Sequence, residues 1–305
     1  MSFGIIIIGD EILSGKRQDK HLTKAIELLS ARGLKLAYAD YVGDDPDRIT
    51  DALKRAFASG DVVFSFGGIG ATPDDHTRQC AARALGREME LHPQAKALIL
   101  ERMHDVAREQ GLPYAPDRDD NLHRLNMGVF PKGAQIIPNP FNKIAGFYCL
   151  SEGNPHALGE HGGIEASAAG SPQGARAPLG GSDPHAVGER GGIFFLPGFP
   201  VMAHPMMAWV LDTQFAHLFR KEAWVEQSII VFGAMEATLT PLMEAIERDH
   251  AVKVFSLPSV DHPEYGRHIE LGVKGTPQAA APAYSALLAG LRDLSAKLGP
   301  ELVRN

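Results

Sequence analysis

The 305-residue sequence has only two cysteines, Cys80 and Cys149, and no long uninterrupted run of apolar residues. The two cysteines are far apart and have no cysteine or histidine neighbours at zinc-ligand spacing. They therefore indicate neither a disulfide framework nor a structural zinc site. The isoleucine run at residues 5–8 is too short for a membrane span or a signal-peptide core, so it is predicted to be a buried strand. These absences favour a cytoplasmic protein that does not bind membranes.

The sequence also lacks an excess of positive charge. Its formal net charge is −7 and its isoelectric point is near 6.0, so it lacks the basic character that attracts nucleic acids or anionic membranes. Small molecules are the expected partners. With 44% apolar and 22% charged residues, the composition is that of a globular protein, and the chain is long enough for two domains.

A glycine-rich stretch, Gly67-Gly68-Ile69-Gly70-Ala71-Thr72-Pro73-Asp74-Asp75-His76-Thr77, stands out against this background. It follows an apolar run and precedes a segment with helical spacing, which predicts strand, loop and helix. Glycines allow close backbone approach, and a helix amino terminus offers free N–H groups, so the stretch is typical of a phosphate site. The alternative is a plain tight turn capped by Asp74 or Asp75. The aspartates favour a metal-bridged phosphate, because carboxylates otherwise repel phosphate.

Strands are also expected at residues 3–8 and 36–42, alternating with helices. This order predicts a mostly parallel sheet with helices on both faces and ligands at the carboxyl ends of the strands. Asp10, Asp44 and Asp75 each follow a strand and should therefore lie on that edge.

Two further segments are harder to interpret. Residues 133–147 read as strand, irregular loop and strand, and could present Asn139, Asn142 and Lys143 to a ligand, although a proline-stiffened surface turn is the favoured alternative. Residues 151–192 are rich in small residues and contain a duplicated segment. They are predicted to be a flexible insertion, and because His161 of the first copy is Arg190 in the second, metal binding there is disfavoured.

The last part of the chain, residues 223–305, is predicted to be a small α+β domain. Strands are expected at 228–232, 252–257 and 268–273, with a final helix whose leucines extend to Leu298. No Gly-x-x-Gly clamp with basic flanks occurs in it, so a scaffold or dimerisation role outranks RNA binding.

Five motifs carry a family resemblance, at residues 9–15, 42–45, 67–77, 137–140 and 196–200. In this order they resemble the MoaB/Mog-type molybdopterin-binding domain, and more closely the amino-terminal part of competence/damage-inducible protein A (CinA). The resemblance implies a three-layer α/β domain over residues 1–222, with the insertion inside it, and a small KH-like domain over 223–305. No stretch resembles the amidase domain of full-length CinA, so deamidation of nicotinamide mononucleotide is not expected.

The resemblance also implies roles for individual residues. Asp44 and Asp75 would be catalytic residues and ligands of a divalent metal. Phosphate contacts would come from Gly67, Gly68, Ile69, Gly70, Thr72 and Thr77, and substrate contacts from Asp10, Glu11, Asn139, Asn142 and Gly198. Several positions depart from the family pattern: Asp10 replaces a common Thr, residues 19–21 replace Asn-Thr-Asn, and residues 142–143 replace Gly-Thr or Gly-Ser. These loops would border the pocket, which leaves the ligand undefined.

Two functions fit these features. The first is hydrolysis of a nucleotide diphosphate of the ADP-ribose or FAD class with Mg²⁺, Mn²⁺ or Co²⁺, in which Glu11 or His76 would relay a proton or simply be a loop residue. The second is binding of molybdopterin or a nucleotide without turnover, in molybdenum cofactor biosynthesis. A purely structural role would leave the acidic loops unexplained. A homo-oligomer is expected, with Met206, Trp209 and the last helix supplying apolar surface.

Overall fold

The computed structural model describes residues 1–151, 191–219 and 225–304, so the predicted insertion lies almost wholly outside the described residues. The chain divides into two compact units, residues 1–219 and 220–305, which are considered separately below.

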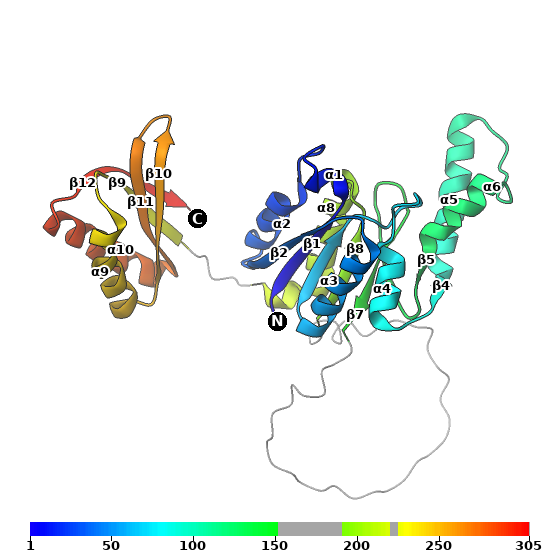
Figure 1. Ribbon diagram of the computed structural model, residues 1–305, viewed down its shortest axis with the longest axis horizontal. Coiled ribbons are helices and arrows are strands. Elements are labelled where there is room, and N and C mark those ends of the chain that lie inside the picture. Colours follow the sequence, from blue (N-terminus) through cyan, green and yellow to red (C-terminus); the bar gives the residue numbers. More distant parts are fainter. Residues whose placement is uncertain (152–190, 220–224, 305) are drawn as a thin grey trace, which may run out of the picture. The chain divides into compact units, whose positions relative to one another are not determined.

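The first unit is built on a six-stranded sheet in the order β2-β1-β3-β8-β7-β6 (Figure 1). Strands β2, β1, β3 and β8 are parallel, whereas β7 and β6 run antiparallel to their neighbours. The mostly parallel sheet predicted from the sequence is therefore confirmed, and the antiparallel pair β6–β7 follows from the short loop that joins them. The strands are β1 (Phe3–Ile8), β2 (Leu36–Val42), β3 (Val62–Phe66), β6 (Gln135–Ile137), β7 (Gly146–Leu150) and β8 (Gly192–Leu196).

Helices cover both faces of this sheet, which confirms the three-layer arrangement (Figure 1). On one face, α2 (His21–Ser30) and α8 (Pro200–Gln214) contribute to one hydrophobic cluster. On the other, α3 (Pro46–Ser59) and α4 (Thr77–Leu85) contribute to a second cluster. The short helix α1 (Asp10–Leu13) follows β1 directly.

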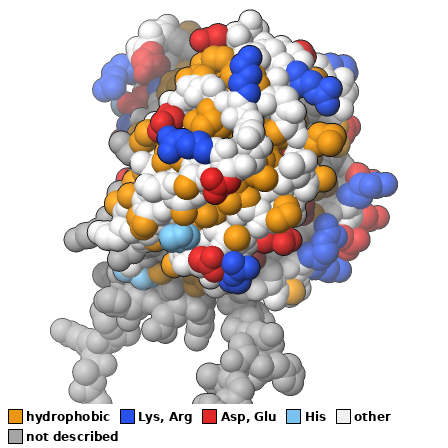
Figure 2. Space-filling view, turned by 90° about the vertical axis from the view of Figure 1, so that its left-hand side faces the viewer, with side chains coloured by type: hydrophobic (Ala, Val, Ile, Leu, Met, Phe, Trp, Pro, Cys, Tyr) orange, Lys and Arg blue, Asp and Glu red, His pale blue; other side chains and the backbone are white. Residues whose placement is uncertain are grey.

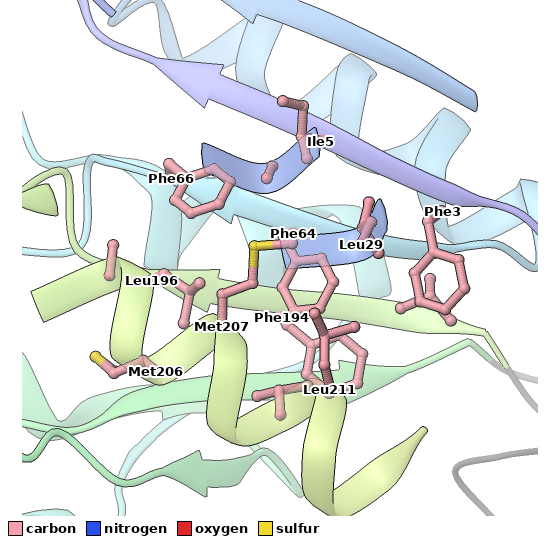
Figure 3. Packing of buried hydrophobic residues seen from close by; sticks show 14 of the residues in the cluster. Phe3, Ile5, Leu29, Phe64, Phe66, Phe194, Leu196, Met206, Met207 and Leu211 are labelled. Carbon is pink, nitrogen blue, oxygen red and sulfur yellow. The ribbon is translucent and has the colours of Figure 1, made fainter. Parts of the chain in front are cut away.

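The core beneath α8 is rich in aromatic rings, as Figure 3 shows. Phe64 of β3 and Phe194 of β8 lie with ring centroids 5.5 Å apart, and Met206 packs against the same cluster. Burial of each such side chain contributes about 1.5–3 kcal/mol. Met206 is fully buried, so the expectation that it supplies an oligomer surface is wrong, whereas Trp209 on the same helix is partly exposed.

Local sequence fixes the turn between β2 and α3. Asp45 caps the helix by accepting hydrogen bonds from the N–H groups of Asp47 and Arg48, and Pro46 occupies the first turn. The helix ends at Ser59, and Gly60, which follows it, has a φ of 70°. This turn places Asp44 at the carboxyl edge of the sheet.

A lobe projects from the sheet beyond α4 (Figure 1). It consists of the two-stranded ladder β4 (Met89–Leu91) and β5 (Val129–Pro131), with α5 (Pro93–Gln110), α6 (Asp119–Leu125) and the 3₁₀ turn η1 (Asn126–Gly128) between them. The ring of Phe130 stacks on that of Phe147 at a centroid distance of 4.6 Å, which fastens the lobe to the sheet.

The second unit is an antiparallel sheet in the order β10-β11-β9-β12, packed against two helices. Its α+β class is confirmed, while the KH-like assignment stays a prediction. Leu298 was predicted in the last helix, but that helix ends at Asp293 and Leu298 lies in β12. The left-handed Ser295 (φ 54°) breaks the helical spacing. The elements are β9 (Val225–Phe232), α9 (Glu236–Asp249), β10 (Lys253–His262), β11 (Gly266–Gly275), α10 (Pro277–Asp293) and β12 (Lys297–Arg304).

Figure 2 shows a face on which apolar side chains lie among lysine, arginine, aspartate and glutamate side chains, so this face carries charges of both signs. Within the described ranges, no helix has the length and hydropathy needed to cross a membrane.

Candidate functional site

A pocket of about 740 Å³ opens at the carboxyl ends of the parallel strands. The segments that directly follow β1, β3 and β8 all contribute to its wall. Asp10 and Asp44, from loops after neighbouring strands, are joined by two hydrogen bonds: Asp10 N–H donates to Asp44 Oδ2 and Asp44 N–H donates to Asp10 Oδ1. Asp44 and Asp75 both line the pocket, so the acidic loops meet at one edge of the sheet as the strand order predicted.

Most of the predicted site residues line this pocket, and two do not. Asp10 lies in a neighbouring hollow beside Tyr41 and Arg48. Thr77 is fully buried beneath the glycine loop. The residues that do line the pocket are Glu11, Asp44, Gly67, Gly68, Ile69, Gly70, Thr72, Asp75, Asn139, Asn142 and Gly198.

The glycine loop has a backbone that only glycine suits at two positions. Gly67 has a φ of 102°, and a Cβ there would collide with the carbonyl oxygen of Ile8. Gly68 has a φ of 67°, and its Cβ would collide with the hydroxyl of Thr77. The glycines thus allow the loop to lie close against β1 and α4.

This loop leaves backbone donors unused at the pocket wall. Gly67 N–H donates to the Leu196 carbonyl at 3.0 Å, but the next three N–H groups, of Gly68, Ile69 and Gly70, have no hydrogen-bond partner in the part of the chain that the structure describes. Consecutive free N–H groups next to a helix amino terminus form a binding site for an anion such as phosphate.

The two threonines of the loop hold its shape. Thr77 donates from its hydroxyl to Gly67 O at 3.1 Å and from its N–H to Gly68 O at 2.9 Å. Thr72 donates from its N–H (2.8 Å) and its hydroxyl (2.5 Å) to Oδ2 of Asp75. The donors of both threonines are therefore engaged within the loop, and the phosphate contacts expected from them stay a prediction.

Asp44 lies in a negatively charged part of the pocket. Burial raises the pKa of its carboxyl group, and the charges of Asp10, Glu11 and Asp74 raise it further, against the opposing hydrogen bond from Asp10 N–H. A divalent cation would relieve this repulsion, and carboxylate oxygens are the ligands that Mg²⁺ prefers.

The protein by itself offers few ligands for such a cation. Among residues 1–151, 191–219 and 225–304, no three histidine, cysteine, aspartate or glutamate side chains are grouped so that they could hold a metal ion. Two carboxylates together with phosphate oxygens and water fit Mg²⁺, which is usually bound by one or two carboxylates plus substrate phosphates. Asp44 and Asp75 therefore suit a metal that arrives with its phosphate ligand.

The loop after β6 contributes Asn139 and Asn142, and its polar groups are largely used within the loop. The buried Asn139 amide donates to Asn142 Oδ1 (2.8 Å) and to the Ile144 carbonyl (2.9 Å), while its oxygen accepts from Phe141 N–H (3.0 Å). Asn139 thus organises the loop rather than offering a free amide to a ligand. Asn142 keeps its Nδ2 group without a partner among the described residues.

Comparison of the sequence with models of known protein families assigns the chain to a family. The model of a family described as "Probable molybdopterin binding domain" matches residues 4–217. The chain belongs to this family. CinA-like proteins from Citrifermentans bemidjiense and Geotalea uraniireducens are 28% and 26% identical to it, over 80% and 92% of this chain. The matches cover 47% and 55% of those relatives, so the chain spans about half their length.

Two solved structures illustrate the likeness in fold. The protein CinA from Thermoplasma acidophilum has a TM-score of 0.47 and 23% identity, over 70% of this chain and 98% of that one. The tungsten cofactor synthesizing protein MoaB from Pyrococcus furiosus has a TM-score of 0.38 and 19% identity, over 71% and 93%.

Several pocket residues of this molybdopterin-binding domain were missed from the sequence. Lys16 and Arg17 line the pocket from the segment after α1, and an apolar wall is formed by Met127, Ile144, Ala145, Phe199 and Met202. Phe199 is 58% exposed. Its place in the motif at residues 196–200 was the one available signal, because side-chain proximity across loops leaves no periodic pattern in the sequence.

A buried histidine supports the turn that carries Phe199. The His21 ring stacks on Phe66 at 4.5 Å, and its Nε2 lies 3.1 Å from the Gly198 carbonyl. Burial lowers the pKa of His21, although the Gly198 hydrogen bond and the charge of Asp19 oppose this shift.

Proposed function

We propose that the pocket binds a nucleotide or pterin through a phosphate group and hydrolyses a nucleotide diphosphate, of the ADP-ribose or FAD class, with a divalent metal. One observation carries this proposal: three consecutive N–H groups, of Gly68 to Gly70, have no partner among the described residues and share a pocket with the carboxylates of Asp44 and Asp75. Free donors and carboxylates together suit a phosphate that is accompanied by a cation.

Each part of the pocket has a role in this reaction. Asp44 and Asp75 would hold Mg²⁺, Mn²⁺ or Co²⁺, which when bound neutralises phosphate charge and activates water. The N–H groups of residues 68–70 stabilise negative charge that develops on the phosphate oxygens. The apolar wall beside Phe199 and Met202 accommodates the ring of the ligand and excludes water from it.

A second candidate is binding without turnover, in molybdenum cofactor biosynthesis. It is favoured by the small number of metal ligands, since within the described ranges no three histidine, cysteine, aspartate or glutamate side chains are grouped so that they could hold a metal ion. A protein that only holds molybdopterin or a nucleotide needs the donors of the glycine loop but no activated water.

The test is release of AMP from ADP-ribose, FAD and NAD with each of the three metals. Asp75→Asn should lower the rate by about 10–100-fold or more, because a metal ligand is lost while the acceptor for Thr72 is retained. Asp51→Asn, an exposed aspartate of α3 outside this pocket, is the matched control and should keep the parent rate.

The outcomes separate the two candidates. Equal rates for the parent and Asp75→Asn would assign the activity to another site or to a contaminant. A lack of product from every substrate, together with binding of a nucleotide or pterin that Asp75→Asn weakens, would favour the binding protein. The expected homo-oligomer is a separate proposal, which light scattering of the same preparation would test.

A further inference from the structure

Two basic residues of the pocket have no role in the arrangement described so far. Lys16 and Arg17 line the same pocket as the glycine loop, although they come from the segment after α1. Both side chains are exposed. Neither makes an ion pair with any residue that the structure describes, even though carboxylates line the same pocket.

The backbone holds these residues at the pocket. Ser14 N–H donates to Asp10 O at 2.8 Å, Gly15 adopts a left-handed conformation with a φ of 71°, and Arg17 N–H donates to Glu11 O at 2.9 Å. These contacts turn the chain back on α1. Lys16 and Arg17 therefore lie at a defined place on the wall, while their long side chains keep the freedom to meet a ligand.

Their chemistry matches an anion that the glycine loop does not itself bind. Three consecutive N–H groups, those of residues 68–70, suit one phosphate group, and a guanidinium with a neighbouring ammonium is a strong partner for another. We infer that Lys16 and Arg17 bind a second phosphate of the ligand, so that the pocket selects compounds with two linked phosphates over those with one. This inference rests on the proposed function and specifies its ligand class.

A different role for the two residues is general electrostatic attraction, without contact to a particular phosphate. In that case they would favour every anionic ligand to a similar degree. A contact to a second phosphate predicts instead a loss confined to ligands that carry it, so the ratio of two affinities decides between these roles.

The experiment measures calorimetric binding of ADP and AMP in Mg²⁺ to the full chain. We expect the parent to bind ADP at least about tenfold more tightly than AMP, the effect of one or two charged hydrogen bonds. The double variant Lys16→Ala/Arg17→Ala should bring this ratio close to one and leave AMP affinity nearly unchanged. Lys54→Ala/Lys96→Ala removes two exposed charges outside the pocket and should keep the parent ratio.

Each other result overturns a defined claim. If the parent does not distinguish ADP from AMP, or if the double variant keeps the parent ratio or weakens both ligands equally, the second-phosphate contact is wrong and the proposed function stands. If the parent binds neither ADP nor AMP, this inference is wrong, and the AMP-release assay decides the proposed function separately. Circular dichroism of all variants verifies that they are folded.

Discussion

Two of the loops that line the pocket use their polar groups in opposite ways. The glycine loop, residues 67–75, leaves three consecutive N–H groups without a partner in the described structure. The asparagine loop, residues 138–144, satisfies most of its own groups, with Asn139 bonded to three positions of the same loop. Both loops contain polar residues, yet only the glycine loop presents a row of open donors.

The property that distinguishes the two loops is whether their backbone donors already have partners. Unused backbone donors cost stability when they are shielded from water, so a loop that keeps them is suited to a ligand that completes them. A loop that satisfies itself is suited to hold a wall in place. The predictions below follow from this contrast: changes in the glycine loop should affect binding most, and changes in the asparagine loop should affect folding most.

The largest effect is expected for Gly68→Ala. The new Cβ would collide with the Thr77 hydroxyl, at a φ that disfavours alanine, so the loop must shift and its donors must move. Nucleotide or pterin affinity should fall by about a hundredfold, the loss of one or more charged hydrogen bonds. Calorimetric binding measures this effect, and denaturant unfolding measures the accompanying change in stability.

Gly60→Ala is the matched control for this variant. Gly60 has nearly the same φ, 70°, but nothing lies within 4 Å of its Cβ position, and it precedes β3 whereas the glycine loop follows that strand. It should lose about 1–2 kcal/mol of unfolding free energy from the left-handed backbone alone and keep full affinity. Equal affinities for the Gly68 variant and the parent would remove the glycine loop from the site.

The next largest effect is expected for Asn139→Ala. Loss of the buried amide leaves the Ile144 carbonyl and the Phe141 N–H without their partner, which should cost about 1–3 kcal/mol of unfolding free energy. Binding should change less than stability. Asn126→Ala removes an exposed amide whose side chain makes no hydrogen bond within the described residues and should be nearly neutral. If Asn139→Ala kept its stability but lost affinity for the nucleotide, the asparagine loop would serve binding rather than folding, and the proposed contrast would be wrong.

The sequence was enough to predict the sheet and the edge at which the site lies, but not all of the side-chain contacts around the pocket. Alternating strands and helices implied a parallel sheet, and a parallel sheet brings Asp44 and Asp75 to one edge. The engagement of Asn139 within its own loop was not predictable, because a side-chain amide satisfies internal and external partners equally well. Lys16 and Arg17 were missed because proximity between loops depends on tertiary packing. Leu298 was placed in a helix because leucine spacing alone does not show where a helix stops.

A pH-dependent effect is expected at His21, which supports the turn carrying Gly198. Burial lowers the pKa of this histidine in the folded state, whereas the unfolded chain has the ordinary value near 6.5. As pH falls below about 6.5, the unfolded state gains a proton that the folded state resists, so stability falls. His204 faces His21 and has a pKa lowered first by burial and then by His21, which adds to the trend.

The check is the free energy of unfolding from pH 8 to pH 5 for the parent and His21→Gln. The glutamine amide can take the place of Nε2 as a donor to the Gly198 carbonyl but does not titrate, so the variant should lose less stability on acidification. Parallel profiles for the two proteins would show that His21 does not contribute to the pH dependence.

The smallest effect is expected at Lys143 in the asparagine loop. This residue has a φ of 64°, and its ammonium lies 2.6 Å from carboxylate oxygens of both Glu101 and Asp105 on α5. Lys143→Gly and Lys143→Ala both remove these ion pairs, so their difference isolates the backbone. The glycine variant should be more stable by about 1 kcal/mol in denaturant unfolding. If the alanine variant equals it, the left-handed backbone at this position is not strained.

The attachment points of residues 152–190 have a practical consequence for engineering. Leu150 pairs directly with Gly192, and Ser151 N–H donates to Gly191 O at 2.9 Å, so the chain leaves β7 and enters β8 across one rung of an antiparallel ladder. This rung lies at the start of β8, at the opposite edge of the sheet from the turn that lines the pocket. A two-residue hairpin turn or an inserted fluorescent reporter can bridge such a spacing. We therefore expect either replacement to leave nucleotide affinity unchanged, which makes this edge the place to shorten the chain for crystallisation.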